Sequence, residues 1–410
     1  MKEFVFFTLN DFTKEGGGTI RILGILNELA KKEVAITLIS NIQDRSKVDS
    51  RVKHIPINFP ISREDKRKIQ FLLGVTNYQT VNRKYKPLLS RLSEIFSTLS
   101  PESKFIFCEY LDNSVGYWLK KNKVIPSYIN DIHGVAGFEF DFQAKQAKNL
   151  KTKLGFMLRK FIAERLDRKV FDEASGIIYA SKAMYSYYDR KYRSFHTKKN
   201  YHLPYLLNDA NVSASDEKLV AEIRKNLDLN ENDFIFLFAG AFKETGGVPD
   251  LIKAFAKVKK RFSSAKLIVI GDGPSYAECE KIVKDEKIGD RCFLVGRKPY
   301  HELSSYQEVA DVIVCPDRQN NYSELIVHVK YLDALASGKL VINGSFKSVQ
   351  EINQDKELSL LFKPSDINSL AEQMSLAITN REELERKFEG VNRYVLEILT
   401  YKNNINVLLN

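Results

Sequence analysis

The strongest constraint on the fold is an arrangement that occurs in both halves of the chain: a short apolar run, then glycines, then a helical pattern. In the first half, the run Phe4–Thr8 is followed by glycines at 16–18, a helical pattern over 22–30 and a second strand-like run, Val34–Ile39. Wholly apolar runs of this length are typical of buried parallel strands, and parallel strands need a crossover between them. The pattern therefore predicts a βαβ unit.

The same alternation extends along most of the chain. A linker with one short helix is predicted over 206–233, and it separates two sets of predicted strands: 104–108, 127–132 and 176–180 before it, and 234–240, 266–270, 291–295, 311–315 and 340–343 after it. A chain of 410 residues also exceeds what one hydrophobic core usually supports. The predicted fold class is α/β, with two Rossmann-like, doubly wound domains that face each other across a cleft.

Other segments carry weaker signals. The segment 56–84 mixes prolines with a basic cluster, which predicts a mobile loop with one short helix. A helix is predicted over 249–262, and another after Pro364-Ser365-Asp366, because serine and aspartate cap free helix amides. The segment Arg381–Thr400 has apolar residues on one side and predicts one long, charged helix.

Composition indicates a soluble protein of a reducing compartment. The apolar fraction of 44% and the charged fraction of 28% are ordinary for a globular chain. No apolar run approaches the roughly 20 residues of a membrane-spanning helix, and the first residues do not resemble a secretory signal. The four cysteines are scattered, without metal-ligand spacing. We therefore expect a cytoplasmic location and no metal site.

The charge is concentrated in the first half. Residues 1–200 hold 36 Lys+Arg against 21 Asp+Glu, whereas the remaining 210 residues hold 27 against 31. The densest stretch, 145–169, has nine basic residues, with apolar residues at helical spacing. A basic amphipathic helix suits the surface of an anionic membrane, which would place the protein at the inner face of the cell membrane. The alternative is a helix whose apolar side packs on its own domain.

Open α/β sheets bind ligands at the carboxyl ends of their strands, where glycine turns lead into helix N-termini. Those N-termini present free amides and a positive dipole, which suit phosphates. The residue pattern by itself thus predicts a nucleotide or a sugar phosphate, held between the two halves.

Several segments of the second half resemble glycosyltransferase family 4, the group 1 glycosyl transferases of the GT-B fold. The strand and turn at 265–274, which end in Gly271-Asp272-Gly273-Pro274, are similar to that family's. The segments 292–297, 303–306, 310–316, 330–339 and 362–366 follow in the family's order and spacing. In the first half, Gly17-Gly18, the segment Asp131–Gly134 and the segment 173–181 also resemble the family.

The resemblance implies a domain plan and a reaction. An acceptor-binding domain would span 1–205, a nucleotide-sugar-binding domain 206–385, and a C-terminal helix, 386–410, would return to the first domain. The implied reaction moves a sugar from a nucleoside-diphosphate sugar with retention of configuration. UDP is favoured over GDP, the acceptor is a glycan or a lipid-linked glycan, and the process is surface polysaccharide synthesis. The family needs no metal.

The resemblance also implies the site residues. Asp333 corresponds to the acid that binds the ribose, and Lys330 would face the phosphates. Glu324 and His133 correspond to catalytic positions beside the transferred sugar. The remaining implied donor-binding residues are Gly17, Gly18, Lys243, Gly271, Gly273 and Arg297.

Two features depart from the family. Glu324 precedes Asp333 by nine positions instead of eight, and Leu325-Ile326-Val327 replaces the glycines that commonly follow the first acid. The usual phosphate-binding arginine and lysine correspond to Ala241 and Gly246, so Lys243 is the nearest substitute.

Three other functions are compatible with parts of this pattern. A sugar-nucleotide epimerase or hydrolase would share the fold but would not explain the basic first half. A non-catalytic subunit of a polysaccharide assembly would explain the missing arginine and lysine. A nucleic-acid-binding protein is suggested by the pI of about 9.1 and the interleaved aromatic residues around Tyr187–Tyr192. The chain lacks any known nucleic-acid-binding pattern, so we expect no nucleic-acid partner.

Overall fold

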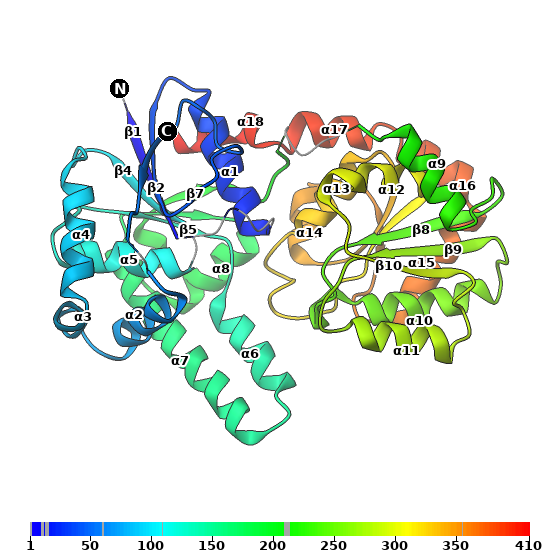
Figure 1. The fold of residues 1–410 in the computed structure, drawn as a ribbon, viewed down its shortest axis with the longest axis horizontal. Coiled ribbons are helices and arrows are strands. Elements are labelled where there is room, and N and C mark those ends of the chain that lie inside the picture. The colour runs from blue at the N-terminus through cyan, green and yellow to red at the C-terminus, as the bar shows by residue number, and fades with distance from the viewer. Residues whose placement is uncertain are drawn as a thin grey trace. The chain divides into compact units, whose positions relative to one another are not determined.

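The computed structural model describes residues 2–9, 12, 16–59, 61–108, 110–208, 214–354 and 356–410, apart from the side chains of residues 63, 110 and 111. The chain divides into two compact units (Figure 1). The first comprises Met1–Tyr205 with Asn404–Asn410, and the second comprises Leu206–Asn403. Most of the predicted C-terminal segment, 386–403, therefore belongs to the second unit. Residues 209–213 of the predicted linker lie outside the described residues.

The first unit is built on a seven-stranded sheet in the order β3-β2-β1-β4-β5-β6-β7. All neighbouring strands of this sheet are parallel. The chain builds the sheet outward from β1 in both directions, so the carboxyl ends of β1 and β4 flank the point where a doubly wound sheet binds ligands. The strands are β1 (Glu3–Thr8), β2 (Ala35–Ser40), β3 (Lys53–Pro56), β4 (Lys104–Cys108), β5 (Ile129–Ile132), β6 (Gly176–Tyr179) and β7 (Lys199–His202).

Aromatic packing holds the helices of the first unit on this sheet. The rings of Phe7 and Phe107, on neighbouring strands, lie 5.2 Å apart, and Phe96 of a helix stacks on Phe107 at 6.2 Å. Trp118, the single tryptophan of the chain, is fully buried. The helices are α1 (Gly17–Ala30), α2 (Arg63–Val75), α3 (Tyr78–Lys84), α4 (Lys86–Ser97), α5 (Tyr110–Lys121), α6 (Ala136–Gln146), α7 (Leu150–Glu173) and α8 (Lys182–Lys191).

The second unit has a six-stranded parallel sheet in the order β10-β9-β8-β11-β12-β13. Its strands are β8 (Phe234–Ala239), β9 (Ala265–Ile270), β10 (Cys292–Gly296), β11 (Val312–Cys315), β12 (Leu340–Gly344) and β13 (Leu360–Phe362). Its helices are α9 (Glu217–Asn226), α10 (Val248–Lys259), α11 (Tyr276–Asp285), α12 (Leu303–Val309), α13 (Val329–Ala336), α14 (Lys347–Asn353), α15 (Ile367–Thr379), α16 (Arg381–Lys387) and α17 (Val391–Ile398), and α18 (Tyr401–Asn404) crosses the boundary between the units.

Two parallel sheets with interleaved helices confirm the predicted α/β class. The facing arrangement of the two domains across a cleft stays a prediction. Three strands, β3, β7 and β13, were not predicted. β3 (KHIP) and β7 (KNYH) contain polar residues and therefore form no apolar run, and β13 has only three residues.

The prediction of a mobile loop over 56–84 is wrong. This segment forms α2 and α3, and Ser62 caps α2 by accepting a hydrogen bond from the amide of Asp65 at 3.0 Å. At the other end of α2, the ammonium group of Lys169 donates to the carbonyl oxygens of Leu73 and Thr76 at 2.6 Å each. A side chain nearly a hundred residues away thus satisfies the end of the helix, and local sequence does not reveal such a partner.

The single helix predicted over 381–400 is also wrong, because the structure divides it into α16 and α17. Gly390, between them, has a φ of +78°, the left-handed conformation with which glycine commonly ends helices. The chain can therefore turn at this point, and α17 begins in a new direction.

The basic segment 145–169 does not form one continuous helix. It covers the end of α6, a short turn and most of α7, and the two helices pack side by side as a hairpin (Figure 1). Lys145 and Lys160 both pair with Asp141, at 2.8 and 2.7 Å, which ties α7 to α6. The C-terminal half of α7 packs into the unit, with Ile162 and Leu166 buried.

The N-terminal half of α7 is different. Five of its six large apolar side chains are between 52% and 71% exposed, and only Phe156 is partly buried. The five, here called the apolar tip, are Leu150, Leu154, Met157, Leu158 and Phe161. The alternative of a helix packed on its own domain is therefore wrong for 150–161 and right for the rest of α7. Among the described residues, no helix combines the length and the apolarity needed to cross a bilayer.

Candidate functional site

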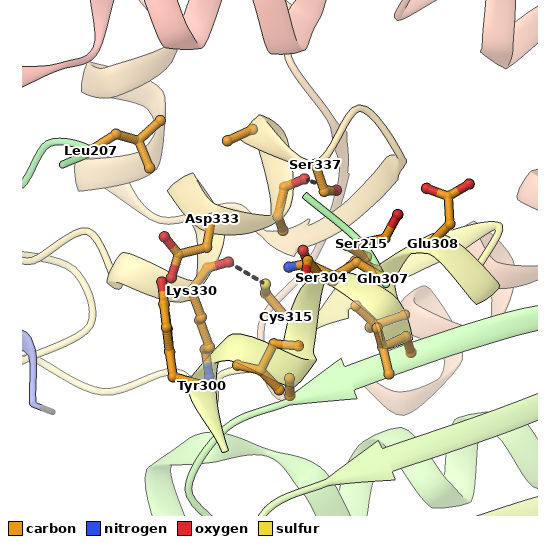
Figure 2. Close-up of a pocket in the computed structure, with 17 residues that line it drawn as sticks. Leu207, Ser215, Tyr300, Ser304, Gln307, Glu308, Cys315, Lys330, Asp333 and Ser337 are labelled. Atoms are coloured by element: carbon orange, nitrogen blue, oxygen red, sulfur yellow. Dashed lines mark hydrogen bonds between the residues drawn. The ribbon is translucent and has the colours of Figure 1, made fainter. Parts of the chain in front are cut away.

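The second unit contains a recess of about 220 Å³ that holds two of the predicted donor-binding residues (Figure 2). Its floor is formed by the ends of β8 and β11, and its walls by α12 and α13. The polar side chains that line it are Ser215, Tyr300, Ser304, Gln307, Glu308, Lys330, Asp333 and Ser337. This set combines two carboxyl groups, an ammonium group, hydroxyl groups and an amide, which suits a ligand rich in hydroxyl groups.

Asp333 is the central acid of the recess. It lies on α13, one turn after the helix begins, and its carboxylate is directed toward Tyr300 (Figure 2). Burial raises the pKa of Asp333 to about 7, although a hydrogen bond with Tyr300 acts in the opposite direction. Near neutral pH a substantial fraction of this carboxyl is therefore ionised, and a ligand that donates two hydroxyl groups would favour the ionised form.

Lys330, one turn earlier on α13, also lines the recess, but another residue compensates its charge. Its ammonium group lies 2.9 and 2.8 Å from the two carboxylate oxygens of Asp317 and 5.3 Å from the ring centre of Phe238. The Nε2 atom of His328 is 3.8 Å from the same carboxylate. The predicted role of Lys330 in binding phosphate stays a prediction, and such binding would compete with Asp317 for the ammonium group.

A second candidate anion-binding element is the loop between β8 and α10. Gly247 has a φ of +66°, and a Cβ at this position would lie 1.8 Å from the carbonyl oxygen of Pro316, so only glycine fits. Gly247 leads into α10 without a side-chain cap, and Lys243 of this loop is exposed. Arg318, whose backbone amide donates to the carbonyl oxygen of Thr245 in this loop, is held by two side-chain hydrogen bonds to Asp250 at 2.6 and 2.7 Å.

The other predicted donor-binding residues of the second unit do not line the recess. A Cβ on Gly271 would lie 1.8 Å from the carbonyl oxygen of Gly240, and one on Gly273 would meet the backbone of Phe242. Close packing of the loops after β8 and β9 therefore explains both glycines without a ligand. Arg297 is exposed and follows the end of β10.

Glu324 is engaged within the unit. One carboxylate oxygen accepts from the side-chain amide of Gln319 at 2.7 Å, and the other accepts from the backbone amide of Lys347 at 3.0 Å. Lys347 is the first residue of α14, so Glu324 caps that helix. The catalytic role of Glu324 stays a prediction, and it would require this carboxylate to exchange an internal partner for a sugar hydroxyl.

The first unit brings its predicted residues to one edge of its sheet. Gly17 and Gly18 are the first two residues of α1, which follows β1, and His133 directly follows β5. The carboxyl ends of parallel strands lie at the same edge. Arg21 of α1 connects the two places, because its guanidinium group binds Asp131 at the end of β5.

Sequence reasoning missed several residues at these sites. Tyr300 and Ser304 line the recess with Asp333, about thirty residues before it. Ser304 lies in the matched segment 303–306 but was given no role, and no pattern in the sequence marks Tyr300. Asp317, which compensates Lys330, was also missed. Arg21 lies three residues after the predicted glycines and is buried. A basic residue among the apolar residues of a helix is unusual, and this could have marked Arg21 in the sequence.

The described residues hold no group of three or more histidine, cysteine, aspartate or glutamate side chains placed to bind a metal. All four cysteines are buried and unbridged, and burial raises the pKa of Cys279, Cys292 and Cys315 to about 12. None of these thiols is therefore disposed to act as a nucleophile near neutral pH.

Solved structures with the same architecture define the class as GT-B. Sucrose-phosphate synthase of Thermosynechococcus elongatus aligns over 100% of this chain and 97% of its own, with a TM-score of 0.69 and 17% identity. HepE of Anabaena, solved in complex with UDP-glucose, aligns over 100% and 99%, with a TM-score of 0.71 and 12% identity. Identities this low indicate the fold alone.

The sequence of the second unit resembles a known family. Residues 220–390, which lie within this unit, match the model of the glycosyl transferases group 1. An uncharacterized glycosyltransferase of Methanocaldococcus jannaschii is 32% identical over 171 residues, which is 42% of this chain and 45% of that protein. Each of the first curated relatives aligns with less than half of this chain, and the alignment also covers less than half of the relative's own length.

Proposed function

We propose that the protein is a retaining glycosyltransferase that moves a sugar from a nucleoside-diphosphate sugar to a glycan or a lipid-linked glycan. The observation that carries this proposal is the position of Asp333. Its carboxylate lies in a recess lined with hydroxyl groups, within the segment that matches the group 1 family. An ionised carboxylate can accept hydrogen bonds from two vicinal hydroxyl groups, which is what a ribose presents.

UDP is the first choice of nucleotide. A structure of the same fold, HepE of Anabaena, is a complex with UDP-glucose, which supports this choice. GDP remains the second choice, because a relative in Mycobacterium tuberculosis is named a GDP-mannose-dependent mannosyltransferase. The family match, at residues 220–390, lies within the second unit and therefore supports mainly the proposal on donor binding.

In the proposed reaction, the bond between the anomeric carbon and the diphosphate breaks, and the acceptor oxygen bonds to that carbon on the same face. The proton of the acceptor hydroxyl passes to the departing diphosphate. Charge builds on that diphosphate, so fixed donors directed at it would lower the barrier. The amides at the start of α10 and the exposed Lys243 are the proposed donors, and His133 is the proposed hydrogen-bond partner of the transferred sugar.

A panel of UDP- and GDP-sugars, measured by thermal shift and then by turnover, tests the proposal. We expect one donor to raise the melting temperature and to release nucleoside diphosphate only when a glycan acceptor is present. Release without acceptor would indicate a hydrolase, and interconversion of the sugar an epimerase. Binding of no donor would favour a non-catalytic subunit, consistent with the compensated charges of Lys330 and Arg318.

We also propose that the protein meets its acceptor at the cytoplasmic face of an anionic membrane, through the apolar tip of α7. The tip places five large apolar side chains on the surface within three turns of helix. Between Asp141 and Glu164 the chain has six basic residues and no acidic one. An exposed apolar face surrounded by cations is complementary to an anionic lipid surface, where acyl chains and headgroups lie side by side.

The structure also distinguishes the lysines that are available to headgroups. Lys145 and Lys160 are engaged with Asp141. The side chains of Lys148, Lys151 and Lys153 form no hydrogen bond or ion pair within the part of the chain that the structure describes. We therefore place the electrostatic contribution in these three lysines, at about 1 kcal/mol each near an anionic surface.

Replacing Lys148, Lys151 and Lys153 with glutamine should weaken binding to vesicles of phosphatidylglycerol and phosphatidylcholine by about a hundredfold. The matched control replaces Lys281, Lys284 and Lys287, three exposed lysines of the second unit, and should leave binding unchanged. Co-sedimentation at several salt concentrations measures both, because salt screens the attraction.

The apolar contribution needs its own variant. Leu154→Ser with Met157→Ser should reduce binding to the same vesicles while leaving the salt dependence in place. If the wild type does not bind at low salt, the membrane proposal fails. A dimer in light scattering that the serine variant converts to a monomer would show instead that a second copy covers the tip.

A further inference from the structure

The second unit contains a buried carboxylate, Asp317, that has two basic side chains as neighbours. Asp317 follows the end of β11 and is 4% exposed. Its two carboxylate oxygens lie 2.9 and 2.8 Å from the ammonium group of Lys330. The Nε2 atom of His328 lies 3.8 Å from Oδ1 of the same carboxylate. Of these two neighbours, Lys330 is within hydrogen-bond distance and His328 lies just beyond it.

This carboxylate lies beside the loop that we propose binds the diphosphate. The residues before and after it both contact the loop between β8 and α10. A Cβ on Gly247 would lie 1.8 Å from the carbonyl oxygen of Pro316, and the amide of Arg318 donates to the carbonyl oxygen of Thr245 at 2.8 Å. A diphosphate at the start of α10 would therefore arrive where the charge of Lys330 is already compensated.

The surroundings of His328 allow its charge to change. Its side chain retains 28% exposure, so protons from solvent reach the ring, whereas Nε2 is shielded and has no hydrogen-bond partner among the described residues. Burial lowers the pKa of His328, the charge of Asp317 acts to raise it, and the charges of Lys330 and Lys243 lower it further. The ring centre of Tyr322 lies 6.4 Å away. While Lys330 stays on Asp317, the ring is therefore neutral near pH 7.

We propose that the ammonium group of Lys330 leaves Asp317 for the diphosphate of the donor, and that His328 then takes up a proton and becomes the new partner of the carboxylate. The proton comes from solvent, and the charged ring carries a proton on each nitrogen, so that Nε2–H faces Asp317. Asp317 and His328 are positioning residues, because they act on the donor through Lys330. This inference rests on the proposed function for the donor, but the coupling between Lys330 and His328 can be measured without a donor.

Three physical reasons favour this exchange. A lysine ammonium group moves on a flexible four-carbon stem, so it can turn to a ligand while α13 stays in place. A buried carboxylate that loses a cationic partner is strongly destabilised unless another cation replaces it. The His328 ring needs to move by less than about 1 Å to bring Nε2 from 3.8 Å to hydrogen-bond distance. A neutral ligand offers the ammonium group no charge in return, so the exchange is specific to ligands that carry phosphate.

The first test needs no donor. ¹³C–¹H correlation spectra of the full chain, labelled with ¹³C-histidine, give the pKa of each of the six histidines, and a His328→Gln sample identifies the signal of His328. We expect its pKa to lie below the ordinary histidine value in the wild type. In Lys330→Met, which keeps a long side chain without the charge, this pKa should rise by about 1 to 3. Lys339→Met removes another compensated lysine, which pairs with Glu308, and should leave the pKa of His328 unchanged.

The second test counts protons. Calorimetric titration with UDP at about pH 7.5, in two buffers that differ in ionisation enthalpy, measures how many protons the protein takes up on binding. We expect the wild type to take up between about half a proton and one proton more per UDP than His328→Gln. Asp333 also titrates near this pH, but it is present in both proteins, so its contribution cancels in the difference. Uridine, which has no phosphate, should give no such difference.

A His328 ring that is already charged at about pH 7.5 in the ligand-free wild type would overturn the inference, even if neither variant folds. An unchanged pKa of His328 in a folded Lys330→Met protein would also overturn it. Equal proton uptake by the wild type and His328→Gln would place the proton on Asp317 or on the nucleotide and refute the role of His328. Absence of binding by both UDP and GDP would refute the proposed function and leave the pKa measurement valid.

Discussion

Asp167→Asn is expected to stabilise the first unit by about 4 kcal/mol at about pH 8, and by much less at low pH. Asp167 lies on the buried half of α7. Burial raises its pKa from 3.8 to about 7; Lys191 acts in the opposite direction and Glu164 adds to the rise. The folded state therefore binds a proton more tightly than the unfolded state, and stability is lost as the pH rises from about 4 through about 7.

The single tryptophan makes this measurement specific to the first unit. Trp118 is buried in that unit, so its fluorescence in urea titrations follows the unfolding of the unit that contains Asp167. Between about pH 5 and pH 8 the wild type should lose about 3 kcal/mol that the variant retains. Asp172→Asn, an exposed aspartate of the same helix, is the matched control and should have the same pH dependence as the wild type. Parallel curves for wild type and Asp167→Asn would contradict the assignment.

Asp333→Ala is expected to weaken the binding of the free nucleoside diphosphate by at least about a hundredfold. The change removes the acceptor of two ribose hydroxyl groups, and hydrogen bonds to a charged group contribute about 1.5–3 kcal/mol each. Calorimetric titration at about pH 8, where the carboxyl is mostly ionised, measures the loss. In the wild type the affinity should fall as the pH decreases through about 7, and in Asp333→Ala this pH dependence should disappear.

Two controls separate the role of Asp333 from the general charge of the recess. Glu308→Gln removes an exposed carboxylate that lines the same recess, and we expect it to change the affinity less than about twofold. Tyr300→Phe removes the hydrogen bond that lowers the pKa of Asp333, so the pH midpoint of binding should shift upward. Equal losses in Glu308→Gln and Asp333→Ala would assign the effect to charge alone, and an unchanged Asp333→Ala protein would make Asp333 an ordinary helix residue.

The sequence determined the plan of the fold because the signals for strands and turns are local. Apolar runs such as Phe4–Thr8 and Phe234–Ala239 form central strands of the two sheets, and the glycines at 271 and 273 form the predicted turn. The family motif likewise placed Lys330 and Asp333 on one helix, because residues one turn apart share a face. Even the break at Gly390 could have been predicted, since glycine commonly ends a helix.

Tertiary structure decided which of these residues have partners. Lys330 is compensated by Asp317, Glu324 caps α14, and Arg21 grips a carboxylate 110 residues further along the chain. No local sequence pattern encodes these pairs. Each pair forms only when the fold brings together residues that lie on different elements.

Tertiary structure also decided which part of the apolar side of α7 is buried. Periodicity shows that a helix has an apolar side, but only the packing of α2, α5 and α6 against α7 buries one half of it and leaves the tip exposed. A sequence thus specifies which faces are apolar, and the free energy of burial is gained only where another element is available to cover them.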